Sequence, residues 1–311
     1  MEELGAGWSR FNNKVIAVNK SAGLSTFDVI RRFRKIIRVK KIGHSGTLDP
    51  LATGLVLLLT GSATKLSGYL MELPKKYIAD IKLGEATDTQ DAEGTIVRTG
   101  EWENTREEDI TAALAGLAGL RKQTPPMFSA LKHRGLPLYA LAREGKEVAR
   151  EPREVNTYSI RLLECDLPVF RIEVHCSKGM YVRVLAEEIG DALGVPAHLH
   201  RLVRTEIGHF HLDDAIDDDS LEQLLEMENP GTGLSEALQH LPQVELDDDQ
   251  EKGLMNGIAP CIVSGLPVAG SLVRLILSDG RLGAIAEAEP AGLVQLKKVF
   301  AAAGQDSGGN Q

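Results

Sequence analysis

Two kinds of hydrophobic pattern occur in turn along this chain. In the first kind, hydrophobic residues alternate with polar ones or form a continuous run. In the second kind, hydrophobic residues recur every three to four positions. The first kind predicts strands and the second predicts amphipathic helices. Strands are expected at 15–18, 55–59, 77–83 and 170–176, and helices at 25–37, 63–72, 107–117 and 182–193. Because these elements mix without a regular strand–helix–strand repeat, the pattern predicts an α+β fold with an antiparallel or mixed sheet.

The pattern changes between residues 213 and 251, where fourteen acidic residues occur without a lysine or arginine. This stretch contains Pro230-Gly231-Thr232-Gly233 and Pro242, a composition typical of loops. We therefore predict one domain over residues 10–243 and a second, β-rich domain over 244–303. In the second domain, strands are expected at 258–263, 272–276 and 282–286, with a hairpin turn at Ser278-Asp279-Gly280 and a disordered tail at 304–311.

Charge is distributed unevenly, although the 311 residues carry a formal net charge of −9. The acidic stretch holds more negative charge than this total, so the rest of the chain is net positive. Seven basic residues and no acidic one lie between Arg31 and Lys41, and a second basic run extends from Arg121 to Arg153. A solvated helix face explains either run alone equally well. Together they favour a nucleic acid partner, because local basic surfaces attract phosphates whatever the total charge.

Composition excludes several classes of protein. No apolar run approaches the roughly 18 residues that cross a bilayer, and the N-terminus lacks a secretory signal, so a cytoplasmic protein without membrane contact is predicted. Cys165, Cys176 and Cys261 are odd in number and far apart, and we expect reduced thiols. The His-x-His pairs at 198–200 and 209–211 lack matching acidic or cysteine residues, so no metal site is predicted.

Glycine and proline punctuate the segment Gly43-His44-Ser45-Gly46-Thr47-Leu48-Asp49-Pro50, which is therefore expected to be a loop. It is not a phosphate-binding loop, since no Gly-Lys-Ser/Thr follows, and it is not a nucleophile elbow, since Thr47 stands where that motif requires glycine. The loop presents an imidazole and a carboxylate, His44 and Asp49, ahead of an apolar strand. On chemistry alone, a turn capped by Asp49 explains it better than a nucleophile or base.

Residues 43–54 resemble the central motif of the TruB family of tRNA pseudouridine synthases, Gly-His-x-Gly-x-Leu-Asp-Pro-x-Ala-x-Gly, at every fixed position. Further blocks that are similar to family motifs follow the family's order. They lie at 19–28, 75–77, 87–94, 123–132, 177–183 and 197–202, so that the resemblance covers about residues 13 to 210. One departure is visible: the opening motif usually reads Lys-Pro-x-Gly, and Ser21 stands here in place of the proline that would stiffen the turn.

The resemblance implies an RNA pseudouridine synthase, which detaches uracil from ribose, turns the base and rejoins it through carbon without a cofactor. It assigns the catalytic carboxylate to Asp49, a charge-stabilising guanidinium to Arg183, and to Tyr77 a ring that stacks on the target uracil or takes its proton. Without the resemblance, Tyr77 reads as a packing aromatic and Arg183 as a surface charge. The residues predicted to bind substrate are His44, Tyr181, Leu202, Lys20 and Lys65.

The resemblance also implies a central mixed, largely antiparallel sheet flanked by helices over 10–243, and a PUA-like RNA-binding domain over 244–303. The expected substrate is the uridine at position 55 in the T-loop of tRNA. The two basic runs are expected to grip the T arm through phosphates, and no obligate protein partner or oligomer is expected. Two alternatives remain open: a catalytically silent RNA-binding or tRNA-folding protein, and a synthase for another RNA, such as an enzyme guided by a small RNA.

Overall fold

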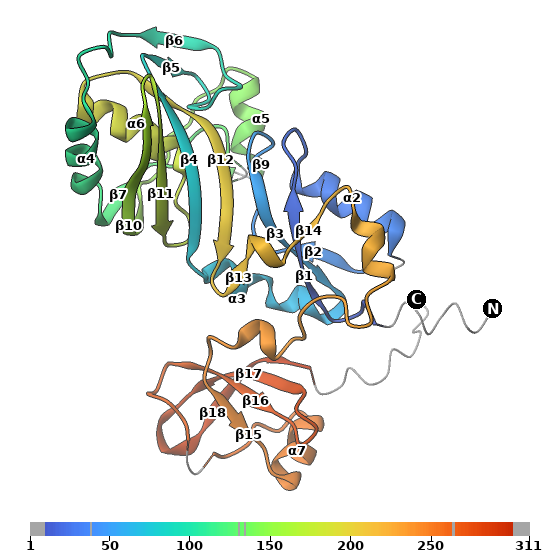
Figure 1. Ribbon diagram of the computed structural model, residues 1–311. Helices are drawn as coiled ribbons and strands as arrows, with labels where there is room; N and C mark the ends of the chain where they lie inside the picture. Colours follow the sequence, from blue (N-terminus) through green and yellow to red (C-terminus); the bar gives the residue numbers. More distant parts are fainter. Residues whose placement is uncertain (1–9, 38, 130, 134, 263–264, 301–311) are drawn as a thin grey trace.

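The computed structural model describes residues 10–37, 39–129, 131–133, 135–262 and 265–300, so the tail predicted at 304–311 lies outside the described residues. One ten-stranded sheet dominates, in the order β14-β1-β3-β12-β4-β11-β10-β7, with β2 beside β3 and β13 beside β12 (Figure 1). The β1–β14 and β3–β12 pairs are parallel and the other pairs are antiparallel. The predicted mixed, largely antiparallel sheet is confirmed. Its strands are β1 Val15–Lys20, β2 Ile42–His44, β3 Thr53–Thr60, β4 Lys75–Leu83, β7 Gly119–Gln123, β10 Arg153–Asp166, β11 Val169–Cys176, β12 Ala197–Ile207, β13 Phe210–His211 and β14 Ile216–Asp217.

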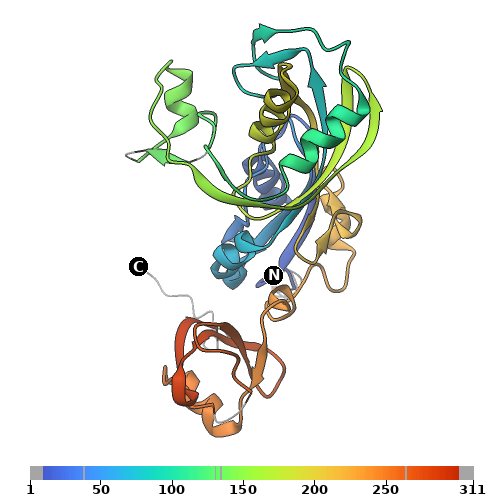
Figure 2. The same ribbon diagram turned by 90° about the vertical axis from the view of Figure 1, so that its left-hand side faces the viewer.

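Three helices cover one face of this sheet: α2 (Thr26–Ile36), α4 (Glu107–Gly116) and α6 (Val182–Leu193) (Figure 2). Ser25 and Asp28 form a capping box that starts α2. The core under the helices includes Phe33 of α2, Leu185 of α6 and Val174 of β11. The predicted helix at 25–37 stops at Ile36, so the basic run from Arg31 to Lys41 is not one helix.

The other face of β3 packs on a second core, because alternate residues of this strand point to opposite sides. Leu57 and Leu59 belong to this core, together with Leu66 and Leu70. Burial on both faces explains why the strand reads as an unbroken apolar run. The helix predicted at 63–72 is in fact two short pieces, the 3₁₀ helix η1 (Gly61–Leu66) and the α-helix α3 (Ser67–Glu72).

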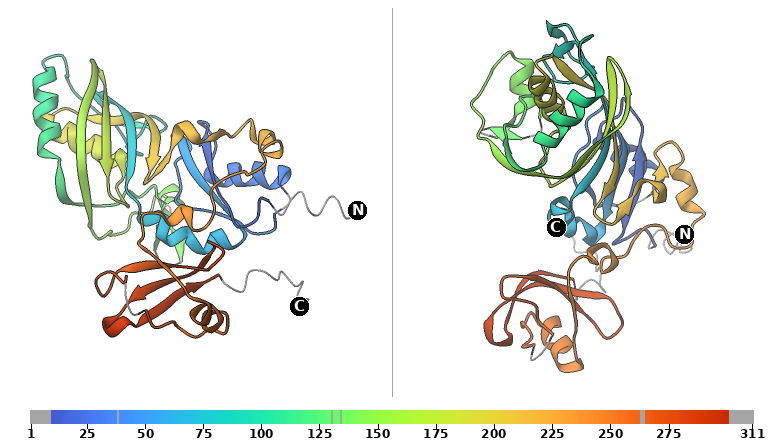
Figure 3. Two further views of the ribbon diagram at one scale, coloured as in Figure 1. Left: turned by 60° about the horizontal axis from the view of Figure 1, so that its bottom comes forward. Right: turned by 60° about the vertical axis from the view of Figure 1, so that its left-hand side comes forward.

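A four-stranded sheet, in the order β15-β16-β17-β18, packs below α3 (Figure 3). Its elements are β15 Gln243–Glu245, α7 Asp248–Met255, β16 Leu272–Ile276, β17 Leu282–Ala288 and β18 Val294–Val299. The strands predicted at 272–276 and 282–286 are confirmed. The strand predicted at 258–263 is wrong over 258–262. The N–H of Ile258 ends α7 by donating to Gly253, and Pro260 has no N–H to donate; Val263 lies outside the described residues.

The remaining elements are short. Two hairpins branch from the large sheet, and within the described ranges no helix is long and apolar enough to span a membrane. Helix α5, in the basic run 121–153, stands away from the large sheet in Figure 2. The bounds are β5 Glu85–Thr87, β6 Ile96–Thr99, β8 Lys132–His133, β9 Leu136–Pro137, α5 Leu138–Arg143, η2 Leu212–Asp214, η3 Leu221–Leu225, η4 Glu236–Leu238 and η5 Pro290–Gly292.

Candidate active site

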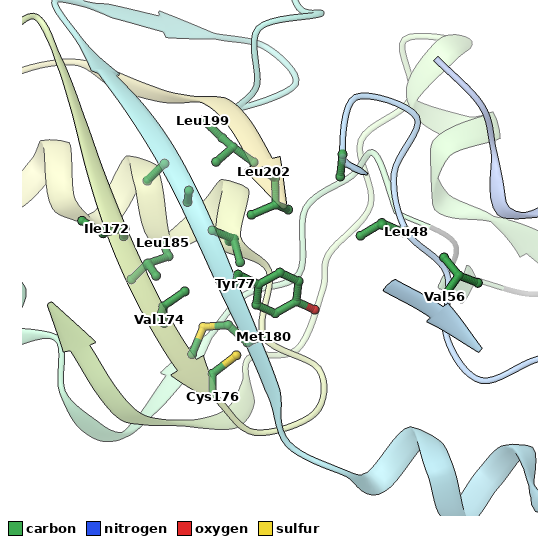
Figure 4. Packing of buried hydrophobic residues seen from close by; sticks show 14 of the residues in the cluster. Leu48, Val56, Tyr77, Ile172, Val174, Cys176, Met180, Leu185, Leu199 and Leu202 are labelled. Atoms are coloured by element: carbon green, nitrogen blue, oxygen red, sulfur yellow. The ribbon is translucent and has the colours of Figure 1, made fainter. Parts of the chain in front are cut away.

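Two neighbouring strands supply one wall of the site. In the antiparallel β4–β12 pair, Tyr77 lies opposite Arg204 and Ala79 lies opposite Leu202. Directly opposed residues share a face of the sheet, as do residues two apart on one strand, so Tyr77, Leu202 and Arg204 all point the same way. Figure 4 shows the Tyr77 ring near Leu202, with its hydroxyl directed toward the segment that carries Leu48.

The loop between β2 and β3 carries Asp49 and is tied down on both sides of it. The Leu48 amide donates to the hydroxyl of Thr26 (3.0 Å), and the Gly23 amide donates to the carbonyl of Pro50 (2.8 Å). The Asp49 side chain keeps 43% of its surface exposed. A carboxylate whose backbone is fixed and whose oxygens reach solvent is suited to meet a substrate.

Arg183, in the first turn of α6, reaches Asp49 from the opposite side. One guanidinium nitrogen, Nη2, lies 3.0 Å from Asp49 Oδ2 and donates to the Phe128 carbonyl at 2.7 Å. Nη1 donates to the Thr89 carbonyl at 3.3 Å and lies 3.6 Å from Asp91 Oδ2. The Arg183 side chain is only 5% exposed, so its position is fixed by these contacts. The alternative interpretation of Arg183 as a surface charge is wrong, because the side chain is buried and its guanidinium pairs with the Asp49 carboxylate.

Tyr77 is a buried phenol beside a buried cation. Loss of hydration raises the pKa of Tyr77, and the nearby Arg204 guanidinium opposes that rise only in part. The tyrosine is therefore neutral near pH 7 and offers a ring face and a hydroxyl. Arg204 itself is anchored by donating from Nε to the Leu55 carbonyl (2.7 Å), while its Nη2 is buried without a hydrogen-bond partner.

His44, on β2, stands at the entrance to the Asp49 loop. Burial lowers the pKa of His44, so the imidazole is uncharged at neutral pH. Its ring makes an edge contact with Phe27, with centroids 5.6 Å apart, and Phe27 is 69% exposed. The pair forms an aromatic surface next to the Asp49 loop, on which a nucleobase can stack.

Tyr181 precedes α6 and is held by a buried glutamine. The Tyr181 amide donates to Gln123 Oε1 (2.8 Å), and Gln123 Nε2 donates back to the Tyr181 carbonyl (3.2 Å). Burial raises the pKa of Tyr181. Arg121, which the sequence assigns to a phosphate-binding run, instead pairs with Glu188 behind this tyrosine.

The structure does not place Lys20 and Lys65 as substrate-binding residues. Lys20 is fully buried, and its ammonium donates to the carbonyls of Ser21 (2.9 Å) and Leu24 (2.8 Å). Lys65 donates to the Val299 carbonyl (3.0 Å), which links η1 to the C-terminal sheet. The sequence shows the positive charge of both lysines, which suggested a contact with RNA. It does not show the backbone carbonyls that the two ammonium groups bind in the folded chain.

Two residues that the sequence reasoning did not single out belong to the site. Asp91 is buried behind Arg183 and accepts a hydrogen bond from the Thr89 hydroxyl (2.6 Å). Arg204 lies two residues after Leu202 on the same face of β12. The available signals were the block at 87–94, which holds Asp91, and the strand period of two, which pairs Leu202 with Arg204.

Other polar clusters in the described residues do not form a second centre. Within the described ranges, no group of three or more His, Cys, Asp or Glu side chains could hold a metal ion. His198 instead makes a hydrogen bond from Nδ1 to the Glu85 carbonyl (3.0 Å). A cavity of about 650 Å³ between α4 and α6 contains none of the predicted site residues.

Comparison with known proteins agrees with the motifs. The sequence profile described as TruB family pseudouridylate synthase (N terminal domain) matches residues 34–182. The chain is 42% identical over 277 residues to a protein of Chromohalobacter salexigens named tRNA pseudouridine synthase B, covering 88% of this chain and 90% of that protein. A protein of the same name from Geobacter sulfurreducens is 42% identical over 282 residues, covering 88% and 92%.

A solved structure agrees in fold along almost the whole chain. A chain from the "Crystal Structure of a Cbf5-Nop10-Gar1 Complex" superposes with a TM-score of 0.73 at 25% identity, covering 94% of this chain and 87% of that one. The sequence relatives, the matched profile and the site geometry all point to one family. The chain belongs to the TruB family of pseudouridylate synthases.

Proposed function

We propose that this pseudouridine synthase acts on tRNA and converts the uridine at position 55 of the T-loop to pseudouridine, with Asp49 as the catalytic carboxylate. The relatives named tRNA pseudouridine synthase B support the substrate class. The observation that carries the proposal is the 3.0 Å contact between Arg183 and Asp49. Residues far apart in sequence meet there in the arrangement that the reaction needs.

The reaction is an isomerisation and consumes nothing. The bond from ribose C1′ to uracil N1 breaks, the base turns, and C1′ joins uracil C5, which gives up its proton while N1 gains one. No electron or group donor enters this balance, so we expect no cofactor. Asp49 acts at the sugar, either by attack on C1′ or by removal of a ribose proton. Both routes use the Asp49 carboxylate, which the Arg183 guanidinium contacts at 3.0 Å and holds in place.

The target base must leave its stack to reach Asp49, and the site offers surfaces that would hold it. The Tyr77 ring would stack on the uracil, with Leu202 beside it and Tyr181 lining the pocket. His44 and the exposed Phe27 ring would fill the space that the base vacates or stack on its neighbour. Because His44 is uncharged at neutral pH, its contribution to binding is stacking rather than attraction to phosphate.

RNA outside the site would be held by charge. Exposed basic residues of the 31–41 and 121–153 runs would contact backbone phosphates of the T arm. Residues 10–243 would form the catalytic domain and 244–303 a PUA-like RNA-binding domain, a division supported by the separate sheet β15–β18 with its own apolar core. The Cbf5 structure is a complex with further proteins. We expect this chain to act as a monomer without them, in the cytoplasm.

The test is product formation by the purified chain alone on an unmodified tRNA transcript. Asp49→Asn is expected to abolish pseudouridine at position 55, read by carbodiimide-stop primer extension, while the Kd for tRNA stays within about threefold, because the amide keeps the volume and loses the charge. A transcript with cytidine at position 55 is the substrate control. Product from Asp49→Asn would refute the catalytic assignment. Binding without product from the parent enzyme would support the silent RNA-binding alternative, and product only on ribosomal RNA would support a synthase for another RNA.

A further inference from the structure

The acidic stretch 213–251 contributes one carboxylate to the interior. Asp218 follows β14, and its side chain is fully buried. The parallel pairing of β14 with β1 brings Asp217 level with Asn19, and the Asp218 amide donates to the Asn19 carbonyl (3.1 Å). The chain therefore delivers Asp218 to the end of β1, where the turn at 21–24 begins.

Asp218 makes three contacts there. Its Oδ1 accepts two hydrogen bonds from Ser21, one from the amide (2.9 Å) and one from the hydroxyl (2.5 Å). Its Oδ2 pairs with Arg32 Nη1 of α2 at 2.6 Å. A buried carboxylate is tolerated only when its oxygens are satisfied in this way. Asp218 thus fastens the turn to α2 and to β14.

The turn is in direct contact with the loop that carries Asp49. The Gly23 amide donates to the Pro50 carbonyl (2.8 Å), and the Lys20 ammonium, which donates to the Ser21 carbonyl (2.9 Å), lies 3.4 Å from the same Pro50 oxygen. Pro50 is the residue after Asp49. A shift of the turn is therefore passed to Asp49 through one carbonyl group.

We propose that Asp218 is a positioning residue for Asp49: by holding Ser21 it fixes the 21–24 turn, and the turn fixes the loop at Pro50. This inference rests on the proposed role of Asp49. It also accounts for Ser21, which stands where the related opening motif has proline. Serine supplies the N–H and O–H that Asp218 accepts, and proline would supply neither but would restrict φ by its ring. Here a carboxylate clamp does what the ring does elsewhere.

A proline ring at position 21 and the Asp218–Ser21 hydrogen bonds are alternative ways to fix the turn, so their variants should show different turnover rates. Asp218→Ala should lower the single-turnover rate constant about tenfold or more, while the Kd for tRNA stays within about threefold. Ser21→Pro alone should also be slow, because it leaves the buried Asp218 Oδ1 without its two donors. The double variant Ser21→Pro/Asp218→Ala should be faster than either single variant, since the ring replaces the clamp.

Three further variants complete the set. Asp218→Asn keeps an oxygen that accepts from Ser21 and should retain more activity than Asp218→Ala. Asp217→Ala is the matched control, because Asp217 is the preceding residue and its exposed carboxylate accepts a hydrogen bond from Asn19 Nδ2 (2.8 Å) rather than from Ser21; its rate should stay within twofold of the parent. Ser21→Ala removes the hydroxyl donor to Asp218 without creating a cavity in the core. It should slow turnover a few-fold, and it tests the clamp even where Asp218→Ala does not fold.

The possible outcomes distinguish a failure of the Asp218 proposal from a failure of the proposed function. If Asp49→Asn is inactive while Asp218→Ala and Ser21→Ala turn over at the parent rate, the clamp has no positioning role and the proposed function stands. If Asp218→Ala is slow but proline at 21 gives no recovery, Asp218 acts on overall stability and the inference is overturned. If Asp49→Asn makes product, the proposed function fails first. Recovery of the rate by the double variant, with unchanged tRNA affinity, supports the clamp.

Discussion

Replacing Arg183 by lysine tests how far the fork shape of arginine matters in this site. The charge is kept, but one ammonium cannot occupy the places of Nη1 and Nη2, which together meet the Asp49 carboxylate and the carbonyls of Thr89 and Phe128. Because the side chain is only 5% exposed, water does not take over the lost contacts. The carbonyl oxygens would then compete with Asp49 for a single cation.

The expected loss follows from these contacts. A hydrogen bond to a charged group contributes about 1.5–3 kcal/mol, and lysine would lose at least one of those that orient Asp49. A loss of roughly 3 kcal/mol in the transition state lowers the rate about a hundredfold, since about 1.4 kcal/mol corresponds to a factor of ten. We therefore expect the single-turnover rate constant of Arg183→Lys to fall about a hundredfold at saturating enzyme. The Kd for tRNA should change little.

The matched control is Arg171→Lys. Arg171 also contacts a carboxylate through two nitrogens, with Nε 2.6 Å from Asp80 Oδ1 and Nη2 3.2 Å from Oδ2, but it lies on β11 and contacts none of the site residues. Its replacement should leave turnover within twofold of the parent. If Arg183→Lys retained more than a fifth of the parent rate, the guanidinium would act as a point charge only, and the argument from its geometry would be wrong.

Two further predictions concern Lys20 and Lys65, whose contacts within the protein the structure shows. Burial lowers the pKa of Lys20 from 10.5 to about 8, so between these pH values the unfolded chain holds a proton that the folded chain has released, and stability rises with pH. The unfolding free energy of the parent minus that of Lys20→Met, from urea melts at pH 7.5 and 9.5, should therefore rise with pH, and its change over the whole interval between the two pKa values should total about 3 kcal/mol; a constant difference would contradict this. Lys65→Ala should leave the Kd for tRNA within twofold, because the ammonium bonds to Val299 at the junction with the C-terminal sheet; a tenfold weaker Kd would restore the role in RNA binding that the sequence suggested.

A helix with uninterrupted periodicity was predictable, and two long strands with bulges were not. Helix α6 has the predicted bounds, because its apolar face repeats regularly and Gly194 ends it in a left-handed conformation at φ 70°. The long strands β10 and β12 were not anticipated. Register shifts lie between Thr157 and Ser159 in β10 and between Leu199 and Arg201 in β12. An extra residue at a bulge reverses the inward and outward positions, so the alternation is lost.

In the site, the residues proposed to act on substrate were predictable, and the residues that hold them in place were not. Asp49, Tyr77 and Arg183 could be named from the sequence, because each stands in a motif that resembles one of the family's. Asp91 and Gln123 could not, since they bind other parts of the protein and their partners come from distant segments. The contacts of Lys20 and Lys65 could not be predicted for the same reason. A long side chain can turn inward, and only the folded chain shows which carbonyls it meets.

Gly54, at the end of the segment 43–54, has a steric role that is separate from the chemistry of Asp49. Gly54 has φ 101°, and a Cβ atom placed on it would lie 2.4 Å from the carbonyl oxygen of Arg204. That close approach is the parallel contact between β3 and β12, where Arg204 pairs with Gly54. The same contact brings the loop carrying Asp49 over the strand pair that carries Tyr77. Glycine at position 54 therefore lets the backbones of β3 and β12 meet closely, and any side chain there would force the two strands, and with them the Asp49 loop, apart.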